Sequence, residues 1–443
     1  MILSPPLAEL EDCFEGVVPA IIATSSADGV PNISYLSHVD MVDDRHVALS
    51  NQFFGKTVDN LRANPGACLM LVDGATGAQY RLDVTWLRNE REGALFRDLA
   101  ANLKASSAQV GMAEVMRLDS VDLFRVEAVS RVRVPNPPPG PAAHWRDWAG
   151  IAAGIGAALA AETEVAGLVT TLLGGITARL GLPAAILFQH DPARGALVTV
   201  ASVGYPESGV GSEVGLGEGI AGGAAQARCV VKVSDMSRVR RFGAAIRATS
   251  EDVAAREIPL PGLPDAQSQI ALPLIARGEL VGVVFAESPA RLAFGRRLVS
   301  ALTLLAGQMA AALLLAETAA EEGAPPGAAP VAPGAGPVFH VAHHAFDDSV
   351  FIDNAYVIKG VAGRLLVYLL RRHLDEGRIE FSNREIRLAP ELRLPDFKDN
   401  LETRLLLLRQ RLAERDCPVR LSRPGRGRVC LDLAGRPRIE SLA

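Results

Sequence analysis

The sequence has few aromatic residues, few cysteines and little net charge. Aromatic side chains make up 5% of the 443 residues, so aliphatic side chains must fill most of any core. The five cysteines are an odd number and contain no CxxC pair. This argues against a disulfide framework or a cysteine-rich zinc site and favours a reducing cytoplasm. A net charge of −5 argues against a uniformly basic nucleic-acid-binding surface.

Long apolar runs and targeting signals are also lacking. Residues 151–161 and 299–316 are apolar, but each segment is too short or too interrupted to span a bilayer. We therefore expect buried helices there and no membrane contact. The first residues do not place a basic segment ahead of an apolar run, so we expect no signal peptide.

The remaining composition is that of a globular protein with several cores. Hydrophobic residues make up 49% and charged residues 21% of the chain, close to the globular average. Segments 135–141 and 323–337 are rich in proline, glycine and alanine, which is typical of linkers. We predict a multidomain chain with domains at 1–134, 150–318 and 339–443, joined by a Pro-rich linker at 135–149 and an Ala/Gly/Pro linker at 319–338.

Charge is unevenly distributed between these pieces. From residue 341 onward the chain has 19 Lys and Arg against 15 Asp and Glu, a net charge of +4. The preceding residues carry 26 against 35, a net charge of −9. A basic end on an acidic body points weakly to a nucleic-acid partner.

In the first piece, short apolar segments alternate with turn residues, which predicts antiparallel hairpins. Strands are expected at 17–25, 32–39, 46–50, 67–72, 79–88 and 121–134, with helices at 56–62 and 92–104. The helix at 56–62 belongs to a Lys-x-x-x-Asn-Leu-x-x-Asn-Pro motif that begins at Lys56. With the two preceding strands, this motif resembles the pyridoxamine 5'-phosphate oxidase-like split barrel over residues 8–134.

That resemblance implies an FMN cofactor held between two subunits of a homodimer. Its phosphate would lie near the start of the helix, where Lys56 supplies a charge and Thr57 a hydroxyl. Two other segments would contribute: the end of one strand beside the phosphate, and the strand that faces the flavin ring. The implied contacts are Ser34, Tyr35, Ser37, Ser50, Asn51, Lys56 and Thr57.

One position departs from the family pattern. Enzymatic members usually carry an arginine beside the phosphate-binding lysine, and Gly55 occupies that place. Some relatives of the barrel bind heme or a deazaflavin. Heme, a deazaflavin or no cofactor are therefore the alternatives to FMN.

The middle piece resembles a GAF domain over residues 155–317. The segment Gly-Glu-Gly-Ile-Ala-Gly at 217–222 and the hairpin at 268–288, with its turn at Arg277-Gly278, carry the resemblance. Helices are expected at 159–180 and 297–317. The resemblance implies a sensor whose small-molecule ligand, unknown here, lies between the sheet and the loop at 236–266. It also implies dimerisation through the terminal helices.

The last piece resembles the winged-helix effector domain of response regulators over residues 348–435. Short strands and a helix at 360–372 precede a capping-box pattern at Ser382–Glu385. A helix at 398–413 repeats leucine at 401, 405, 408 and 412, which is one core stripe. The Leu-Arg-Gln-Arg-Leu segment at 408–412 and the Gly-Arg-Gly turn at 425–427 carry the resemblance.

A helix of this size beside an arginine-rich hairpin suits phosphate and base contacts with duplex DNA. The candidate DNA contacts are Asn400, Arg404, Arg411, Arg423, Arg426 and Arg428. However, Leu406 and Leu407 stand where DNA-binding members usually carry polar residues. A leucine patch favours a protein contact instead, which is the alternative for this domain.

No metal site and no catalytic residue is predicted. Three histidines and two aspartates lie between residues 340 and 348, but their spacing fits no known metal cage. We interpret the chain as a cytoplasmic one-component regulator that couples cofactor and GAF ligand sensing to a winged-helix output. The alternatives are an FMN-dependent oxidoreductase with a regulatory GAF domain, and a scaffold whose output is protein contact.

Overall fold

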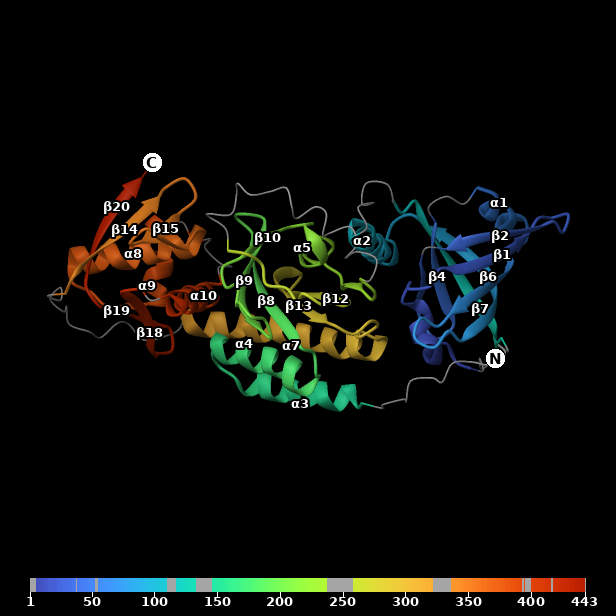
Figure 1. The fold of residues 1–443 in the computed structure, drawn as a ribbon, viewed down its shortest axis with the longest axis horizontal. Helices are drawn as coiled ribbons and strands as arrows, with labels where there is room; N and C mark the ends of the chain where they lie inside the picture. The colour runs from blue at the N-terminus through green and yellow to red at the C-terminus, as the bar shows by residue number, and fades with distance from the viewer. Residues whose placement is uncertain are drawn as a thin grey trace.

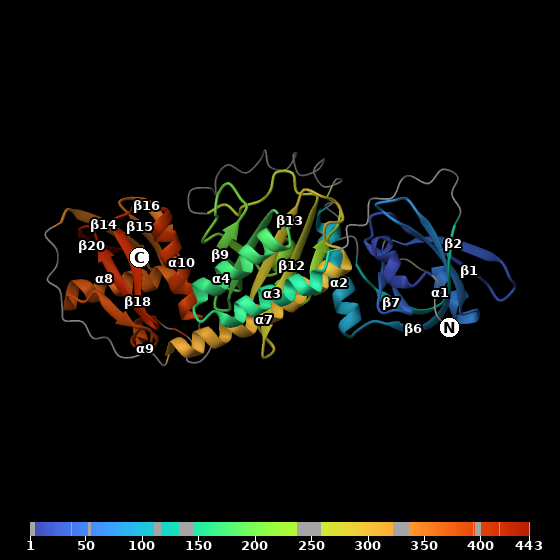
Figure 2. The same ribbon diagram turned by 90° about the horizontal axis from the view of Figure 1, so that it is seen from below.

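The computed structural model describes residues 5–36, 38–51, 55–109, 117–132, 146–236, 258–321, 336–392, 394, 400–415 and 417–442. The described chain forms three bodies in a row, with the N-terminal body at one end and the C-terminal body at the other (Figure 1). A view from below keeps the same order (Figure 2). Only the middle body therefore contacts both of its neighbours.

The N-terminal body is a seven-stranded antiparallel sheet in the order β2-β1-β5-β6-β7-β4-β3. Strand β1 alternates buried and partly exposed side chains, and the inward residues Ile22, Leu69, Leu82 and Phe124 of the sheet are almost fully buried. Strand β1 begins after Pro19, later than the expected start at 17, because proline cannot donate to a ladder. The elements are η1 (Leu7–Phe14), β1 (Ala20–Ser25), β2 (Pro31–Leu36), β3 (Val39–Met41), β4 (His46–Asn51), α1 (Gly55–Ala63), β5 (Gly66–Val72), β6 (Gln79–Glu90), α2 (Ala94–Gln109) and β7 (Ser120–Arg131).

The middle body is a six-stranded antiparallel sheet in the order β10-β9-β8-β13-β12-β11. Helices α3, α4 and α7 pack on one face, and α5 packs on the other together with α2 from the N-terminal part of the chain. The elements are α3 (Trp148–Ala161), α4 (Val165–Gly174), a π-helical turn η2 (Gly175–Arg179), β8 (Ala184–Asp191), β9 (Ala196–Val203), β10 (Glu213–Gly215), α5 (Gly219–Ala227), β11 (Val231–Val233), β12 (Ser268–Ala276), β13 (Glu279–Ser288) and α7 (Arg296–Glu321).

The helix expected at 159–180 is interrupted in the structure. Helix α3 ends at Ala161 and α4 begins at Val165, because Glu162 and Glu164 at the two caps are extended. The break lets both helices pack against α7. Helix α7 is long and apolar enough to cross a membrane by length and composition alone, but it packs on α3 and β12, as expected for a buried helix.

In its described residues, the C-terminal body combines two sheets with the helices α8, α9 and α10. One sheet has the order β16-β15-β14-β20, with β14 and β20 parallel, and the other has the order β17-β19-β18. The capping box is confirmed, because the Ser382 hydroxyl accepts a hydrogen bond from the Glu385 amide at the start of α9. The elements are β14 (Val338–His344), β15 (Ser349–Ile352), β16 (Ala355–Ile358), α8 (Gly360–Glu376), β17 (Glu380–Ser382), α9 (Asn383–Leu388), η4 (Pro390–Leu392), α10 (Leu401–Glu414), β18 (Val419–Gly425), β19 (Arg428–Leu433) and β20 (Arg436–Leu442).

Candidate functional sites

A cluster of hydroxyl and amide groups joins β2 to the start of α1. The Ser34 and Thr57 hydroxyls are 2.8 Å apart, and the Asn32 amide donates to Thr57 Oγ1 at 3.1 Å. Below them, the Asn60 amide donates to Thr24 Oγ1 at 3.1 Å. The structure therefore brings two of the expected cofactor contacts, Ser34 and Thr57, together. Sequence reasoning did not single out Asn32, Thr24 and Asn60, although Asn60 is part of the Lys-x-x-x-Asn motif.

Lys56 and Tyr35 lie on the same two elements as this cluster. Lys56 is exposed on the first turn of α1, next to buried Thr57. Tyr35 is 75% exposed on the edge strand β2. Ser37 lies outside the described residues. The pair of Lys56 and Thr57 thus offers one charge and one hydroxyl at a helix start.

Ser50 and Asn51 end strand β4 and are almost fully buried. The Ser50 hydroxyl donates to the His38 carbonyl at 3.3 Å, which places it at the junction of β2 and β3. The Asn51 amide donates to Asp122 Oδ2 at 3.1 Å. Asp122 also accepts from Trp86 Nε1 at 3.0 Å and from the Asn89 amide at 2.9 Å. The Asn51 side chain is thus part of a buried network centred on Asp122.

The middle body holds a buried carboxylate on the sheet face covered by α5. Glu287 is 2% exposed, and it accepts hydrogen bonds from the Leu263 amide at 2.9 Å and from the Gln269 side chain. Burial raises the pKa of the Glu287 carboxyl. Burial and the neighbouring Glu287 also raise the pKa of Tyr205. Of the loop expected to cover a ligand, residues 237–257 lie outside the described part of the chain.

The N-terminus of α10 is capped by a glutamate from the middle body. Glu317, near the end of α7, accepts hydrogen bonds from the amides of Glu402 at 2.9 Å and Thr403 at 2.8 Å, and from the Thr403 hydroxyl at 2.8 Å. Glu317 is 5% exposed. Helices satisfy their first amides with such acceptors, so α10 is held at its N-terminus by another body of the chain.

The polar face expected on α10 is covered, which corrects the expectation of an open DNA-contacting face. Arg404 is 6% exposed, and its guanidinium lies 3.6 Å from Asp191 of β8. Arg411 is 7% exposed, and its Nε donates to the Val357 carbonyl at 2.8 Å. The carbonyl of Asn400 accepts from the Gln189 amide at 3.3 Å. Arg404 is covered because α10 packs against β9, α4 and α7 of the middle body, whereas Arg411 is covered by β16 of its own body.

The leucine patch explains why this face is covered. Leu406 is 5% exposed and belongs to the core of the middle body, together with residues of α3, α4 and α7. Leu407 is 4% exposed and belongs to the core of the C-terminal body, beside Val210 of the middle body. The two leucines thus belong to two different cores, and each of these cores includes residues of the middle body.

The hairpin arginines have different environments. Arg423 donates to the buried Glu402 carboxylate, with one contact of 2.7 Å. Arg428 lies 3.7 Å from the Glu380 carboxylate. Arg426, at the turn, is exposed. Of the six candidate DNA contacts, Arg426 alone is exposed.

Two of the three bodies match known protein families. Residues 7–131 match the family described as pyridoxamine 5'-phosphate oxidase. Residues 160–314 match the family described as GAF domain. The chain carries a pyridoxamine 5'-phosphate oxidase-like barrel and a GAF domain. No curated protein matches the chain.

Similar solved structures each cover one body. HupZ from Group A Streptococcus is 22% identical, and the match covers 30% of this chain and 97% of that chain with a TM-score of 0.22. The GAF domain of an Acinetobacter phosphoenolpyruvate-protein phosphotransferase is 18% identical, covering 40% and 96% with a TM-score of 0.32. An FMN-binding protein from Syntrophomonas wolfei is 15% identical, covering 29% and 88% with a TM-score of 0.23.

Proposed function

We propose that the chain is a cytoplasmic sensor in which the barrel and the GAF domain control the availability of a winged-helix output domain. The observation that supports this proposal is that one face of α10 is covered by the GAF domain. Glu317 caps its N-terminus, Asp191 faces Arg404, and Leu406 lies in the GAF core. A signal that weakens this contact would release α10 together with the arginine hairpin. Such a signal must bind the released form better than the docked form.

The barrel is the proposed site of an FMN cofactor. The family of the barrel and the hydroxyl cluster of Ser34 and Thr57 beside Lys56 support this assignment. A phosphate at the start of α1 would accept from the Thr57 hydroxyl and from the Lys56 ammonium. A flavin supplies reversible one- and two-electron chemistry. The absorption spectrum of the purified protein tests the assignment: flavin bands support it, and a Soret band or a colourless protein contradicts it.

Duplex DNA is the proposed partner of the released output domain. The domain is the basic end of the chain, and Arg426 is already exposed at the hairpin turn. The arrangement of α8, α9 and α10 with the β17-β19-β18 sheet is compatible with the winged-helix proposal. In the docked form, however, α10 cannot enter a groove because the GAF domain covers it. DNA binding should therefore depend on release.

The full chain with Glu317→Lys tests this dependence. A lysine at this buried position would place a positive charge against the N-terminus of α10, which the helix dipole disfavours. We expect this variant to retain duplex DNA at low salt, whereas the wild type and the matched surface variant Glu207→Lys do not. Each phosphate contact should contribute about −0.9 to the slope of log K against log salt. Adding Arg426→Ala should flatten that slope by about one unit.

Hydrogen exchange of α10 in the same variants makes the result decisive. If exchange shows that Glu317→Lys releases α10 and DNA is still not retained, DNA is not the partner. The output would then be a contact with another protein through the leucine patch, because Leu406 already packs against another domain within the chain.

A further inference from the structure

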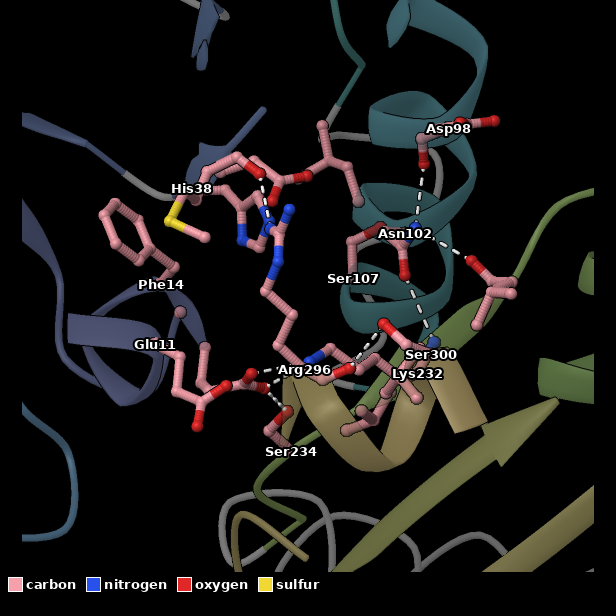
Figure 3. Close-up of a pocket in the computed structure, with 18 residues that line it drawn as sticks. Glu11, Phe14, His38, Asp98, Asn102, Ser107, Lys232, Ser234, Arg296 and Ser300 are labelled. Carbon is pink, nitrogen blue, oxygen red and sulfur yellow. Dashed lines mark hydrogen bonds and ion pairs between the residues drawn. The ribbon is translucent and has the colours of Figure 1, made fainter. Parts of the chain in front are cut away.

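A cavity of about 590 Å³ lies where the barrel meets the GAF domain. Its walls come from η1, the β2–β3 junction, helix α2, strand β11 and the first turns of α7 (Figure 3). This volume is within the range of small-molecule sites, about 300–1,000 Å³, and such sites are common between domains. The cavity is separate from the Ser34–Thr57 cluster and from the Glu287 carboxylate, neither of which lines it.

Direct contacts between the two domains hold the walls of this cavity in place. The Asn102 side chain on α2 donates to the Val230 carbonyl at 3.2 Å and accepts from the Lys232 amide at 3.1 Å. It thus satisfies the backbone of the edge strand β11. Lys232 Nζ lies 2.6 Å from a Glu15 carboxylate oxygen. The cavity is therefore preformed, and a ligand would find its polar groups already positioned.

Charges of both signs remain uncompensated on these walls. Lys232 and Glu15 neutralise each other. Arg296 extends from α7 toward the His38 side of the cavity, where it donates to the Met41 carbonyl at 2.7 Å, a neutral acceptor (Figure 3). Across the described part of the chain, no carboxylate pairs with Arg296 and no cation pairs with Glu11 or Asp40. One unmatched cation and two unmatched carboxylates thus share one cavity.

Asp40 is the carboxylate that can serve a cationic group of a ligand. It lies on β3 of the barrel, next to the Met41 carbonyl that Arg296 contacts. Asp98 on α2 also lines the cavity, but its side chain points away from Arg296 (Figure 3). An ammonium group beside Asp40 would be favoured, because opposite charges at short range favour each other's ionised form.

Apolar side chains from all three parts of the wall also line the cavity. Phe14 comes from the barrel, Leu103 from α2, and Val230 and Val299 from the GAF domain. An apolar group of a ligand would contact all three parts of the wall. Binding sites of this type combine an apolar lining with a few polar groups that fix orientation.

We propose that this interdomain cavity binds a small zwitterion of the amino-acid type with an apolar side chain. Its carboxylate would bind Arg296, its ammonium would bind Asp40, and its side chain would pack on Phe14 and Leu103. Because the site contacts both domains, occupancy would strengthen their contact. The site requires neither FMN in the barrel nor DNA at the output domain, so its test is independent of the function proposed above.

Calorimetric titration of the full chain with three matched probes tests the proposal. L-phenylalanine carries both charges, L-phenylalaninamide lacks the carboxylate, and 3-phenylpropanoate lacks the ammonium. We expect L-phenylalanine to bind at least tenfold more tightly than either single-charge probe. Absence of binding by all three probes, or equal binding of all three, overturns the proposal.

Variants that remove one charge each test which residue binds the carboxylate of the ligand and which residue binds its ammonium. Arg296→Gln should weaken L-phenylalanine and 3-phenylpropanoate at least tenfold and leave L-phenylalaninamide unchanged. Asp40→Asn should weaken L-phenylalanine and L-phenylalaninamide and leave 3-phenylpropanoate unchanged. The exposed residues Arg277 and Asp44 provide the matched controls Arg277→Gln and Asp44→Asn. A loss that is the same for all three probes, or that the controls reproduce, also overturns the proposal.

Discussion

At the scale of single residues, Glu317 should make stability depend on pH. Burial raises the pKa of its carboxyl from 4.5 to about 7, although three hydrogen bonds favour the ionised form. The folded protein therefore keeps this proton to higher pH than the unfolded chain. Its contribution to the free energy of unfolding should fall as pH rises from about 4.5 to about 7, on the order of 3 kcal/mol in total.

Urea unfolding at pH 5 and at pH 8 measures this effect. Glu317→Gln cannot titrate, so the difference in midpoint between the two pH values should shrink. The exposed Glu207 has no such environment, and Glu207→Gln should keep the wild-type difference. A Glu317→Gln protein with an unchanged pH dependence would show that other groups cause it.

Lys56 is the residue that tests the cofactor proposal. If it binds the flavin phosphate, Lys56→Ala should weaken FMN about tenfold, the equivalent of one charge-assisted hydrogen bond. The effect should decrease with salt, because Lys56 is exposed. Fluorescence titration of FMN into the apoprotein measures it. Lys104 on α2 is also exposed, and equal losses for Lys104→Ala and Lys56→Ala would remove Lys56 from the site.

At the scale of elements, α10 has two buried faces that belong to different cores. Leu408 is fully buried in the C-terminal body, and Leu406 is buried in the GAF core. Leu408→Ala should destabilise the C-terminal body by about 3–5 kcal/mol, as for other fully buried leucines. Leu406→Ala lies at a boundary and should cost less, about 2 kcal/mol.

Hydrogen exchange separates the two outcomes. Leu406→Ala should raise exchange along α10 and the end of α7 while β18 and β19 stay protected. Leu408→Ala should raise exchange throughout the C-terminal body. Identical exchange patterns in the two variants would contradict the division of α10 between two cores.

The same helix shows what sequence can and cannot predict. The leucine repeat at 401, 405, 408 and 412 correctly predicts the face that packs within the C-terminal body. The helical period carries no information about a second domain that approaches the other face. Leu406 and Leu407, which interrupt the expected polar surface, were the local signal of this contact. Arg404 looked exposed because its partner, Asp191, is more than two hundred residues away.

At the scale of the whole molecule, two of the three bodies could be assigned from local motifs, but the contacts between them could not. The Lys56 motif and the segment at 217–222 carry the two family resemblances. The interdomain cavity instead brings together residues from Glu11 to Ser300. The sequence does not indicate a role for Asn102. Its side chain bonds the backbone at the unpaired edge of β11, and that edge is apparent only in the folded structure.

Oligomeric state is a prediction at this scale, and the barrel suggests which surface carries it. Strand β2 is an edge strand, and Ile33 and Tyr35 on it are 69% and 75% exposed. An exposed apolar edge favours association with another copy. We expect a homodimer at micromolar concentration, joined through β2.

Light scattering of two variants tests both the dimer and its surface. Ile33→Lys places a charge on the β2 edge and should give a monomer. Leu304 on α7 is 64% exposed, and Leu304→Lys should leave the dimer intact if β2 forms the interface. If Leu304→Lys alone gives the monomer, the copies pair through the GAF helices. Because the expected flavin contacts Ser34 and Tyr35 lie on β2, an interface there should also make FMN affinity fall in Ile33→Lys. A monomeric wild type would contradict an interfacial cofactor altogether.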